Sequence, residues 1–267
     1  MQNIPITVPQ CFRIIAHRGA SAYAPENTRP AFELARRMEV REVELDTQLT
    51  TDGVVVLCHD DSLDRYGNGD HVVEEMCSAE LRSLDMGSWF SPFLFANTPM
   101  LTLGSLLDDF GNDFVFHIEL KGVAADLPAA VFALVEERNM LDHLIVTSFS
   151  FDHLQRMRQI SSCRLGWLVH EFSQEVLDRA AELDLLQLCP PARTVTRDLV
   201  EVGHRVAEEV RAWGVGGTPK EVRLLTCKII ESGCDGMTTN WPDWATHQGN
   251  RLFGMVRTEA GDPQGES

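Results

Sequence analysis

The sequence predicts a (β/α)8 barrel of the TIM type. Apolar strand-like runs alternate with amphipathic helical segments along most of the 267 residues. About eight such repeats can be distinguished, the number that closes a parallel barrel. The structural alternative is a doubly wound open sheet, but no GxGxxG motif opens a helix anywhere in the chain.

The first repeat begins with the apolar run Arg13–Ala16, and Thr28 is placed to cap the amphipathic helix that follows. Residues Val43–Leu49 then alternate between polar and apolar, and Val54–Cys58 is rich in β-branched residues. The turn sequence Thr51–Gly53 separates the two runs, so we expect a hairpin-like pair of strands.

From residue 102 onward the alternation becomes regular. We expect these helix–strand pairs: Thr102–Phe110 with Phe114–Leu120, Leu127–Arg138 with Leu144–Ser148, Phe151–Ile160 with Arg164–Val169, Gln174–Leu183 with Leu186–Cys189, Thr196–Arg205 with Glu209–Trp213, and Pro219–Ser232 with Asp235–Thr239. Residues 60–101 are rich in Asp, Gly and aromatic residues and suit an insertion or lid over one end of the core. We expect one domain over residues 1–247, followed by a C-terminal segment, 248–267, whose last residues are disordered.

The charge balance limits the partners. Lys and Arg total 23 against 40 Asp and Glu, a net charge of -17, which disfavours nucleic acid and anionic membrane surfaces. Screening confines that repulsion to about 8 Å at physiological salt, so a local cationic cluster can still attract a small phosphate ester. No window is apolar enough for a membrane span, so stable membrane insertion is not expected.

Seven scattered cysteines form no CxxC pair and are expected to be free thiols in a reducing compartment. With no signal-peptide pattern at the N-terminus, the sequence favours a cytoplasmic location. It leaves the oligomeric state open, a homo-oligomer included.

Three carboxylates stand out because strand residues two apart share a face. Glu44 and Asp46 therefore point to one side of their strand, and Glu119 shares a face with His117 and Lys121. Near the C-terminal ends of barrel strands such side chains meet at the mouth, where active sites of this fold lie. Oxygen ligands of this kind suit one divalent cation, Mg²⁺ or Ca²⁺.

His17 and His59 each follow an apolar run at a strand-to-loop junction. Imidazole titrates near neutrality, so one can accept a proton from an attacking oxygen while the other donates one to the leaving oxygen. We therefore predict that both are catalytic. His117 is expected one layer deeper, below the metal.

Cationic and aromatic side chains complete the candidate site. Arg18 and Lys121 either contact phosphate oxygens or neutralise the carboxylates, and both roles can coexist. Trp213 ends a late strand, where it either covers the apolar part of a substrate or packs at the mouth. Glu26 and Asn27 are interpreted as structural residues of the first loop.

Taken in order, these motifs strongly resemble those of the glycerophosphodiester phosphodiesterases, a family related to the phosphatidylinositol-specific phospholipases C. The resemblance covers roughly residues 13–245 and rests on HRG at 17–19, PENT at 25–28, ELD at 44–46, TDG at 51–53, HD at 59–60, LDR at 63–65, DMGSWF at 85–90, IELK at 118–121, TSFS at 147–150 and GCDGMTTNWP at 233–242.

The resemblance implies a TIM barrel with a small insertion that hydrolyses glycerophosphodiesters to sn-glycerol 3-phosphate and an alcohol. It also implies that His17 and His59 are the acid/base pair, that Glu44, Asp46 and Glu119 hold the cation, and that Arg18 and Lys121 contact phosphate. Attack by the substrate's glycerol hydroxyl, giving a cyclic phosphate, and direct attack by water both stay open.

The chain departs from the family pattern at 39–42, 66–67 and 214–216. None of these positions carries a proposed catalytic or metal residue, so we expect an active enzyme with altered loop shape and headgroup preference. Two alternatives remain: a phospholipase D- or C-like phosphodiesterase acting on a lipid headgroup, and a catalytically silent barrel that only binds a phosphate ester.

Overall fold

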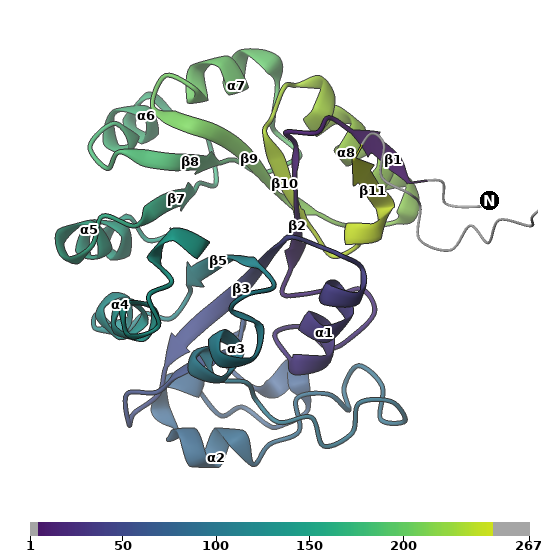
Figure 1. The fold of residues 1–267 in the computed structure, drawn as a ribbon, viewed down its shortest axis with the longest axis vertical. Coiled ribbons are helices and arrows are strands. Elements are labelled where there is room, and N and C mark those ends of the chain that lie inside the picture. The colour runs from purple at the N-terminus through teal and green to yellow at the C-terminus, as the bar shows by residue number, and fades with distance from the viewer. Residues whose placement is uncertain (1–4, 248–267) are drawn as a thin grey trace, which may run out of the picture.

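The computed structural model describes residues 5–247. Eight parallel strands close into a barrel, because β2 pairs with both β3 and β10 (Figure 1). The strands are, in order around the barrel, β2 (Arg13–His17), β3 (Glu42–Leu49), β5 (Val115–Leu120), β6 (Leu144–Ser148), β7 (Arg164–Leu168), β8 (Leu185–Cys189), β9 (Ala207–Val215) and β10 (Gly236–Thr239). The predicted (β/α)8 barrel is confirmed.

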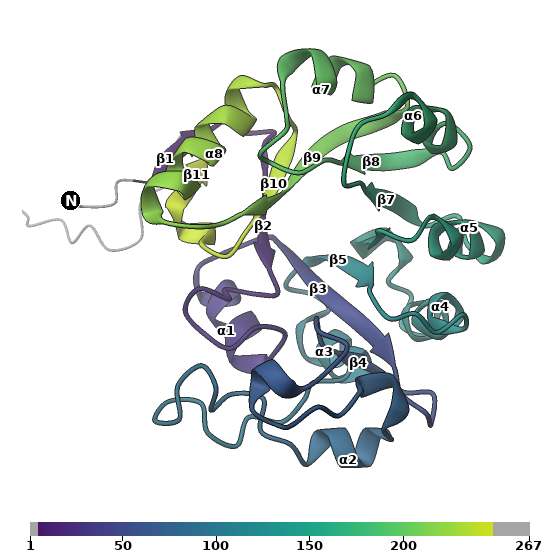
Figure 2. The same ribbon diagram turned by 180° about the vertical axis from the view of Figure 1, so that it is seen from behind.

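Helices cover the outside of the barrel, and each connection between consecutive barrel strands contributes at least one (Figure 2). They are α1 (Arg29–Arg37), α2 (Ser78–Arg82), α3 (Leu103–Phe110), α4 (Leu127–Glu137), α5 (Phe151–Ile160), α6 (Gln174–Ala180), α7 (Arg197–Gly203) and α8 (Pro219–Glu231). The six predicted helix–strand pairs are all present, with bounds that differ by no more than three residues.

Serine and threonine residues determine where most of these helices begin. In α3, α5, α6, α7 and α8, the hydroxyl of the preceding Ser or Thr accepts a hydrogen bond from a backbone N–H of the first turn. Thr28 does precede α1, but its hydroxyl donates to the Pro25 carbonyl and makes no cap bond. Thr28 thus occupies the predicted N-cap position, where its backbone carbonyl accepts from the Ala31 N–H at 3.0 Å, while its hydroxyl closes the loop before the helix.

The predicted hairpin is also present. β4 (Val55–Leu57) runs antiparallel to β3, with Gln48 opposite Val56. The chain then forms the insertion, which has a small apolar core of its own that includes Leu63, Tyr66 and Leu81. This core gives the insertion a defined structure beside the barrel.

A second, two-stranded sheet joins the ends of the described chain. β1 (Ile6–Val8) pairs in parallel with β11 (Ala245–His247). Val8 and Ala245 are buried in one apolar cluster together with Phe12. Sequence patterning did not predict this sheet, because each strand is only three residues long and its partner lies at the other end of the chain. The predicted disorder of the C-terminal segment concerns residues 248–267, which lie outside the described residues.

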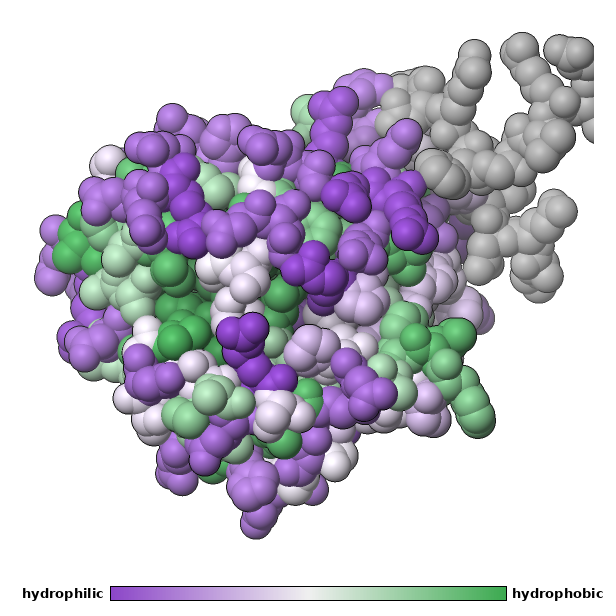
Figure 3. Space-filling view, turned by 60° about the horizontal axis from the view of Figure 1, so that its bottom comes forward, coloured by the Kyte–Doolittle hydropathy of each residue, from purple (hydrophilic) through white to green (hydrophobic). Residues whose placement is uncertain are grey.

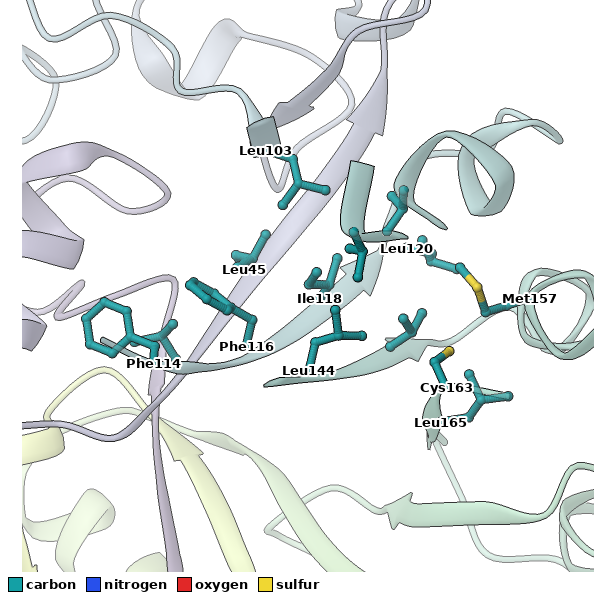
Figure 4. Close-up of a cluster of buried hydrophobic side chains, with 14 of the residues drawn as sticks. Leu45, Leu103, Phe114, Phe116, Ile118, Leu120, Leu144, Met157, Cys163 and Leu165 are labelled. Atoms are coloured by element: carbon teal, nitrogen blue, oxygen red, sulfur yellow. The ribbon is translucent and has the colours of Figure 1, made fainter. Parts of the chain in front are cut away.

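The barrel strands separate polar from apolar side chains. Outward-facing residues pack against the helices, and Figure 4 shows Leu45, Phe116 and Ile118 in this layer. On β3, Glu44 and Asp46 lie on either side of Leu45 in the sequence. They face the barrel interior, as the alternation predicted. The strands thus place a hydrophobic core outside the barrel and polar chemistry within it.

We predict that Phe116→Ala lowers the free energy of unfolding by about 3–5 kcal/mol, because it leaves a cavity where a ring with no exposed surface stood. Urea denaturation measures this loss. Leu224→Ala is the control: that side chain on α8 is 59% exposed, and its loss should change stability by no more than about 0.5 kcal/mol. Equal effects of the two substitutions would contradict this placement of the core.

Candidate active site

Three neighbouring strands bring the predicted site residues together. The register places His17 beside Glu44 across β2 and β3, and Asp46 beside Glu119 across β3 and β5. His17 is the last residue of β2 and Glu119 the last but one of β5, so the register sets Glu44 and Asp46 level with the C-terminal ends of both neighbours, the end at which barrel enzymes carry their active sites.

The three carboxylates form one buried acidic triad. Glu44, Asp46 and Glu119 each offer an oxygen atom, and these oxygens lie within 4.8 Å of one another. Burial, and then the charges of Asp46 and Glu119, raise the pKa of Glu44 well above its usual value. Burial and Asp46 likewise raise the pKa of Glu119 to about 7. The triad thus concentrates negative charge where little water can screen it.

The donor set fits a divalent cation. Asp46 Oδ1 is buried and has no hydrogen-bond partner, which is unusual for a carboxylate oxygen in a protein interior. Three carboxylates, one of them with an unsatisfied oxygen, match the all-oxygen coordination preferred by Mg²⁺ and Ca²⁺. Glu44, Asp46 and Glu119 would hold such an ion.

Arg18 supplies the nearest positive charge. Its Nε lies 3.0 Å from Asp46 Oδ2, its Nη1 donates to Glu26 Oε1 at 2.9 Å, and its backbone N–H donates to Glu44 Oε2 at 3.1 Å. Burial by itself would raise the pKa of Asp46, but Arg18, followed by His59 and His17, outweighs it and lowers that pKa. Arg18 therefore neutralises carboxylates in this structure, one of the two roles predicted for it.

Asn27 also belongs to the site. Its amide Nδ2 donates to Asp46 Oδ2 at 2.8 Å, and the Asp46 backbone N–H donates to Asn27 Oδ1 at 3.3 Å. The residue has a φ of 55°, a left-handed conformation that asparagine tolerates better than most residues. The interpretation of Glu26 and Asn27 as merely structural was too narrow, because both contact charged residues of the site. Their place in the loop directly after the His17 strand was the available signal.

His17 is oriented by a residue that is distant in the sequence but follows the neighbouring strand β10. Its Nδ1–H donates to Asn240 Oδ1 at 2.6 Å, and its Nε2 lies 3.8 Å from Glu44 Oε2. Burial and the adjacent Arg18 lower the pKa of His17 to about 4, so the ring is neutral at pH 7 with Nε2 free to accept a proton. Sequence reasoning missed Asn240, although its position directly after the β10 strand could have identified it.

His59 is oriented by a carboxylate. Its Nδ1 donates to Asp60 Oδ1 at 2.5 Å, and Asp60 Oδ2 accepts from Arg65 Nε at 2.5 Å. Arg65 also donates to Glu26 Oε1 at 2.6 Å. The pKa of Asp60 is lowered to about 2, since hydrogen bonds from Arg65 and His59 outweigh its partial burial. The Asp60–Arg65 pair was not predicted, and it links His59 to the same Glu26 that holds Arg18.

Lys121 and Trp213 meet through an aromatic ring. Lys121 Nζ lies 3.5 Å from Glu119 Oε1 and 5.7 Å from the centre of the Phe149 ring. Trp213 contacts Phe149 edge to face, with ring centres 5.2 Å apart, and its Nε1 donates to the Val169 carbonyl. Lys121 therefore lies beside the triad, and Phe149 connects it with Trp213.

The deeper layer agrees with the prediction for His117. This side chain is fully buried, and its Nε2 donates to Glu42 Oε2 at 2.8 Å, while Arg13 pairs with the same carboxylate at 3.0 Å. Burial lowers the pKa of His117, so a neutral ring hydrogen-bonds the carboxylate of Glu42, which pairs with Arg13 and lies two residues before Glu44 on β3.

Comparison with known proteins shows the family to which the chain belongs. Residues 17–244 match the model of the glycerophosphoryl diester phosphodiesterase family. The chain belongs to this family. It is therefore assigned to the hydrolases that cleave glycerophosphodiesters, and the resemblance inferred from the motifs is confirmed. The family generally uses a divalent metal, which the buried triad fits.

Relatives match over most of their length. Bacillus subtilis YhdW is 42% identical over 88% of this chain and 97% of its own. A glycerophosphodiester phosphodiesterase of Caldanaerobacter subterraneus is 29% identical over 86% of this chain and 94% of its own. An Oleispira antarctica phosphodiesterase, solved with the product sn-glycerol-3-phosphate, superimposes with a TM-score of 0.77 at 25% identity, covering 88% of this chain and 94% of its own.

The described residues hold no helix that is both long and apolar enough to cross a membrane.

We predict that Glu119→Gln stabilises the metal-free protein more at pH 8 than at pH 5. The folded-state pKa of Glu119, about 7, lies above the ordinary 4.5. The protonated carboxyl therefore favours folding at low pH, and this contribution is lost as pH rises from about 4.5 to 7. At pH 5 the protonated acid resembles the amide, whereas at pH 8 the substitution removes a buried charge and should gain about 2 kcal/mol.

Thermal or urea unfolding of both proteins in chelator, at the two pH values, measures the difference. An equal effect at both would contradict the raised pKa. Glu75→Gln, at an exposed position outside the triad, is the matched control.

Proposed function

We propose that this chain hydrolyses glycerophosphodiesters to sn-glycerol 3-phosphate and an alcohol with the help of one divalent cation held by Glu44, Asp46 and Glu119. The observation that carries the proposal is the convergence of this buried triad with two histidines, His17 and His59. Each histidine has its Nδ1 engaged by an oxygen, which leaves its Nε2 available. The product in the related Oleispira phosphodiesterase is consistent with this reaction.

The cation is proposed to be Mg²⁺ or Ca²⁺, because every donor is a carboxylate oxygen. When bound, it would neutralise the triad and withdraw electron density from the substrate's phosphate.

The two histidines are proposed to share the proton transfers. His17 suits the role of base, since its ring is neutral at pH 7 and its Nδ1 proton is fixed by Asn240. His59 is given the complementary role of acid, because the Asp60 carboxylate engages its Nδ1 and leaves Nε2 for the leaving oxygen. The attacking oxygen is either water or the substrate's glycerol hydroxyl, and the latter would produce a cyclic phosphate first.

Three further residues are proposed to bind substrate. A guanidinium carries five N–H donors, so Arg18 can contact a phosphate oxygen while it pairs with Asp46 and Glu26. Lys121 offers a second cationic donor beside Glu119. Trp213 would cover the apolar part of the released alcohol.

The silent-barrel alternative expects a missing histidine or carboxylate, and this chain retains them all. We treat residues 1–247 as one catalytic domain, since the proposed site residues come from one barrel. We also infer a cytoplasmic location, because all seven cysteines are free.

Chelation tests the cation. We predict that EDTA abolishes hydrolysis of glycerophosphocholine and that Mg²⁺ or Ca²⁺ restores it, because without the ion the repulsion within the triad is not offset. Choline release measures the activity. Asp46→Asn, which removes one charged ligand, should require a higher concentration of added metal for half-maximal rate. Full activity after exhaustive chelation would reject metal dependence.

Replacement of His17 tests the acid/base assignment. We predict that His17→Ala lowers kcat by about 10²–10⁴, the usual contribution of a positioned general acid or base. His143→Ala is the matched control, because this exposed histidine ends the 3-10 turn directly before β6, and it should leave kcat unchanged. Unfolding curves for both variants separate lost catalysis from lost folding. Wild-type turnover in His17→Ala would remove His17 from the mechanism.

A further inference from the structure

Large hydrophobic side chains are exposed at one end of the barrel. The most exposed among the described residues are Phe93 (95%), Val123 (81%) and Leu94 (77%), ahead of Leu224 and Ile160 on the outer helices. Phe93 and Leu94 belong to the connection between β3 and β5, and Val123 follows the end of β5. Both connections leave the C-terminal ends of barrel strands, the end that carries the candidate active site.

The segment around Phe93 and Leu94 is free of charge. Residues 86–107 contain no Asp, Glu, Lys, Arg or His, although the chain has a net charge of -17. Figure 3 brings the end of the molecule that carries the insertion toward the viewer and shows a hydrophobic projection at its lower right. A charge-free apolar projection on an acidic protein fits an apolar, uncharged or zwitterionic surface better than an anionic one.

A backbone hydrogen bond and an aromatic pair hold the turn that carries Phe93 and Leu94. The Phe95 backbone N–H donates to the Ser91 carbonyl at 2.9 Å, which closes a turn around Phe93 and Leu94. The rings of Phe90 and Phe95 meet edge to face beneath that turn, with centres 5.7 Å apart. The turn therefore presents its two apolar side chains outward while the flanking rings pack against each other.

A chain of contacts connects this turn with the candidate active site. Phe90 contacts Trp89, and the Arg65 guanidinium lies 5.2 Å from the centre of the Trp89 ring. Arg65 donates to Asp60, which orients His59. The exposed tip is thus built on the same insertion scaffold that positions a proposed catalytic histidine.

We propose that Phe93 and Leu94 form a docking tip that enters the surface of a zwitterionic lipid membrane or micelle. Docking would present the barrel mouth to phosphodiesters that carry an acyl chain and reside in that surface. Two side chains provide only weak and reversible attachment. The docking itself needs no catalysis, but its use on lipid-borne substrates rests on the proposed function.

Cosedimentation with phosphatidylcholine vesicles tests the tip. The wild-type protein should sediment with the vesicles, and the double variant F93S/L94S should show a vesicle partition coefficient about 10–100-fold lower, since each buried side chain contributes roughly tenfold. The control double variant I160S/L224S changes exposed residues on outer helices and should bind as the wild type does. Absence of wild-type binding, or equal binding by F93S/L94S, would overturn the proposal.

An activity comparison separates this proposal from the proposed function. F93S/L94S should hydrolyse soluble glycerophosphocholine at the wild-type kcat/KM but lose about tenfold in rate on micellar lysophosphatidylcholine. If wild type cleaves glycerophosphocholine and the tip variant matches it on both substrates, docking is wrong and the proposed function stands. If wild type cleaves neither substrate although it binds vesicles, the proposed function fails while docking stands.

A second copy of the chain is the competing occupant. Sedimentation velocity without lipid should give the same oligomeric state for wild type and F93S/L94S. A change of oligomeric state in the tip variant, together with unchanged vesicle binding, would assign the tip to self-association and overturn the lipid proposal.

Discussion

Mutual repulsion among three buried carboxylates is the constraint on which the rest of the site depends. Oxygens of Glu44, Asp46 and Glu119 lie within 4.8 Å of one another at one end of the barrel. Charges removed from water destabilise a fold unless they are paired, and like charges add to that cost. Arg18 and Asn27 offset part of it at Asp46. The pKa values of Glu44 and Glu119 stay raised, which means that their ionised forms are not fully compensated by the protein. A bound cation would compensate them.

The two histidines differ in the residues that surround and orient their rings. Burial and the neighbouring Arg18 lower the pKa of His17, and Asn240 orients its ring. His59 is oriented by the ionised Asp60. One fold thus provides an imidazole held neutral and another paired with a carboxylate, which suits the opposite proton transfers of ester cleavage. Both depend on oxygens that hold Nδ1 and direct Nε2 elsewhere.

Residues of the insertion form hydrogen bonds with residues of the candidate active site. Glu26 accepts hydrogen bonds from Arg18 on the barrel side and from Arg65 and Tyr66 on the insertion side. Its own pKa is lowered, because these arginines outweigh its burial. Glu26 therefore couples the position of the insertion to that of the carboxylate cluster, so a change in the insertion can alter catalysis and substrate choice together.

The sequence by itself determined the repeat of strands and helices, and it determined which carboxylates share a strand face. Period-two alternation is a local property, so it placed Glu44 with Asp46, and Glu119 with Lys121, without knowledge of the fold. Only the tertiary structure decided that Asn240 orients His17, that Glu26 joins Arg18 to Arg65, and that β1 pairs with β11. These contacts form between segments brought together by barrel closure and by the folding of the insertion. They depend on the register of distant segments, which local patterns of hydrophobicity and charge do not encode.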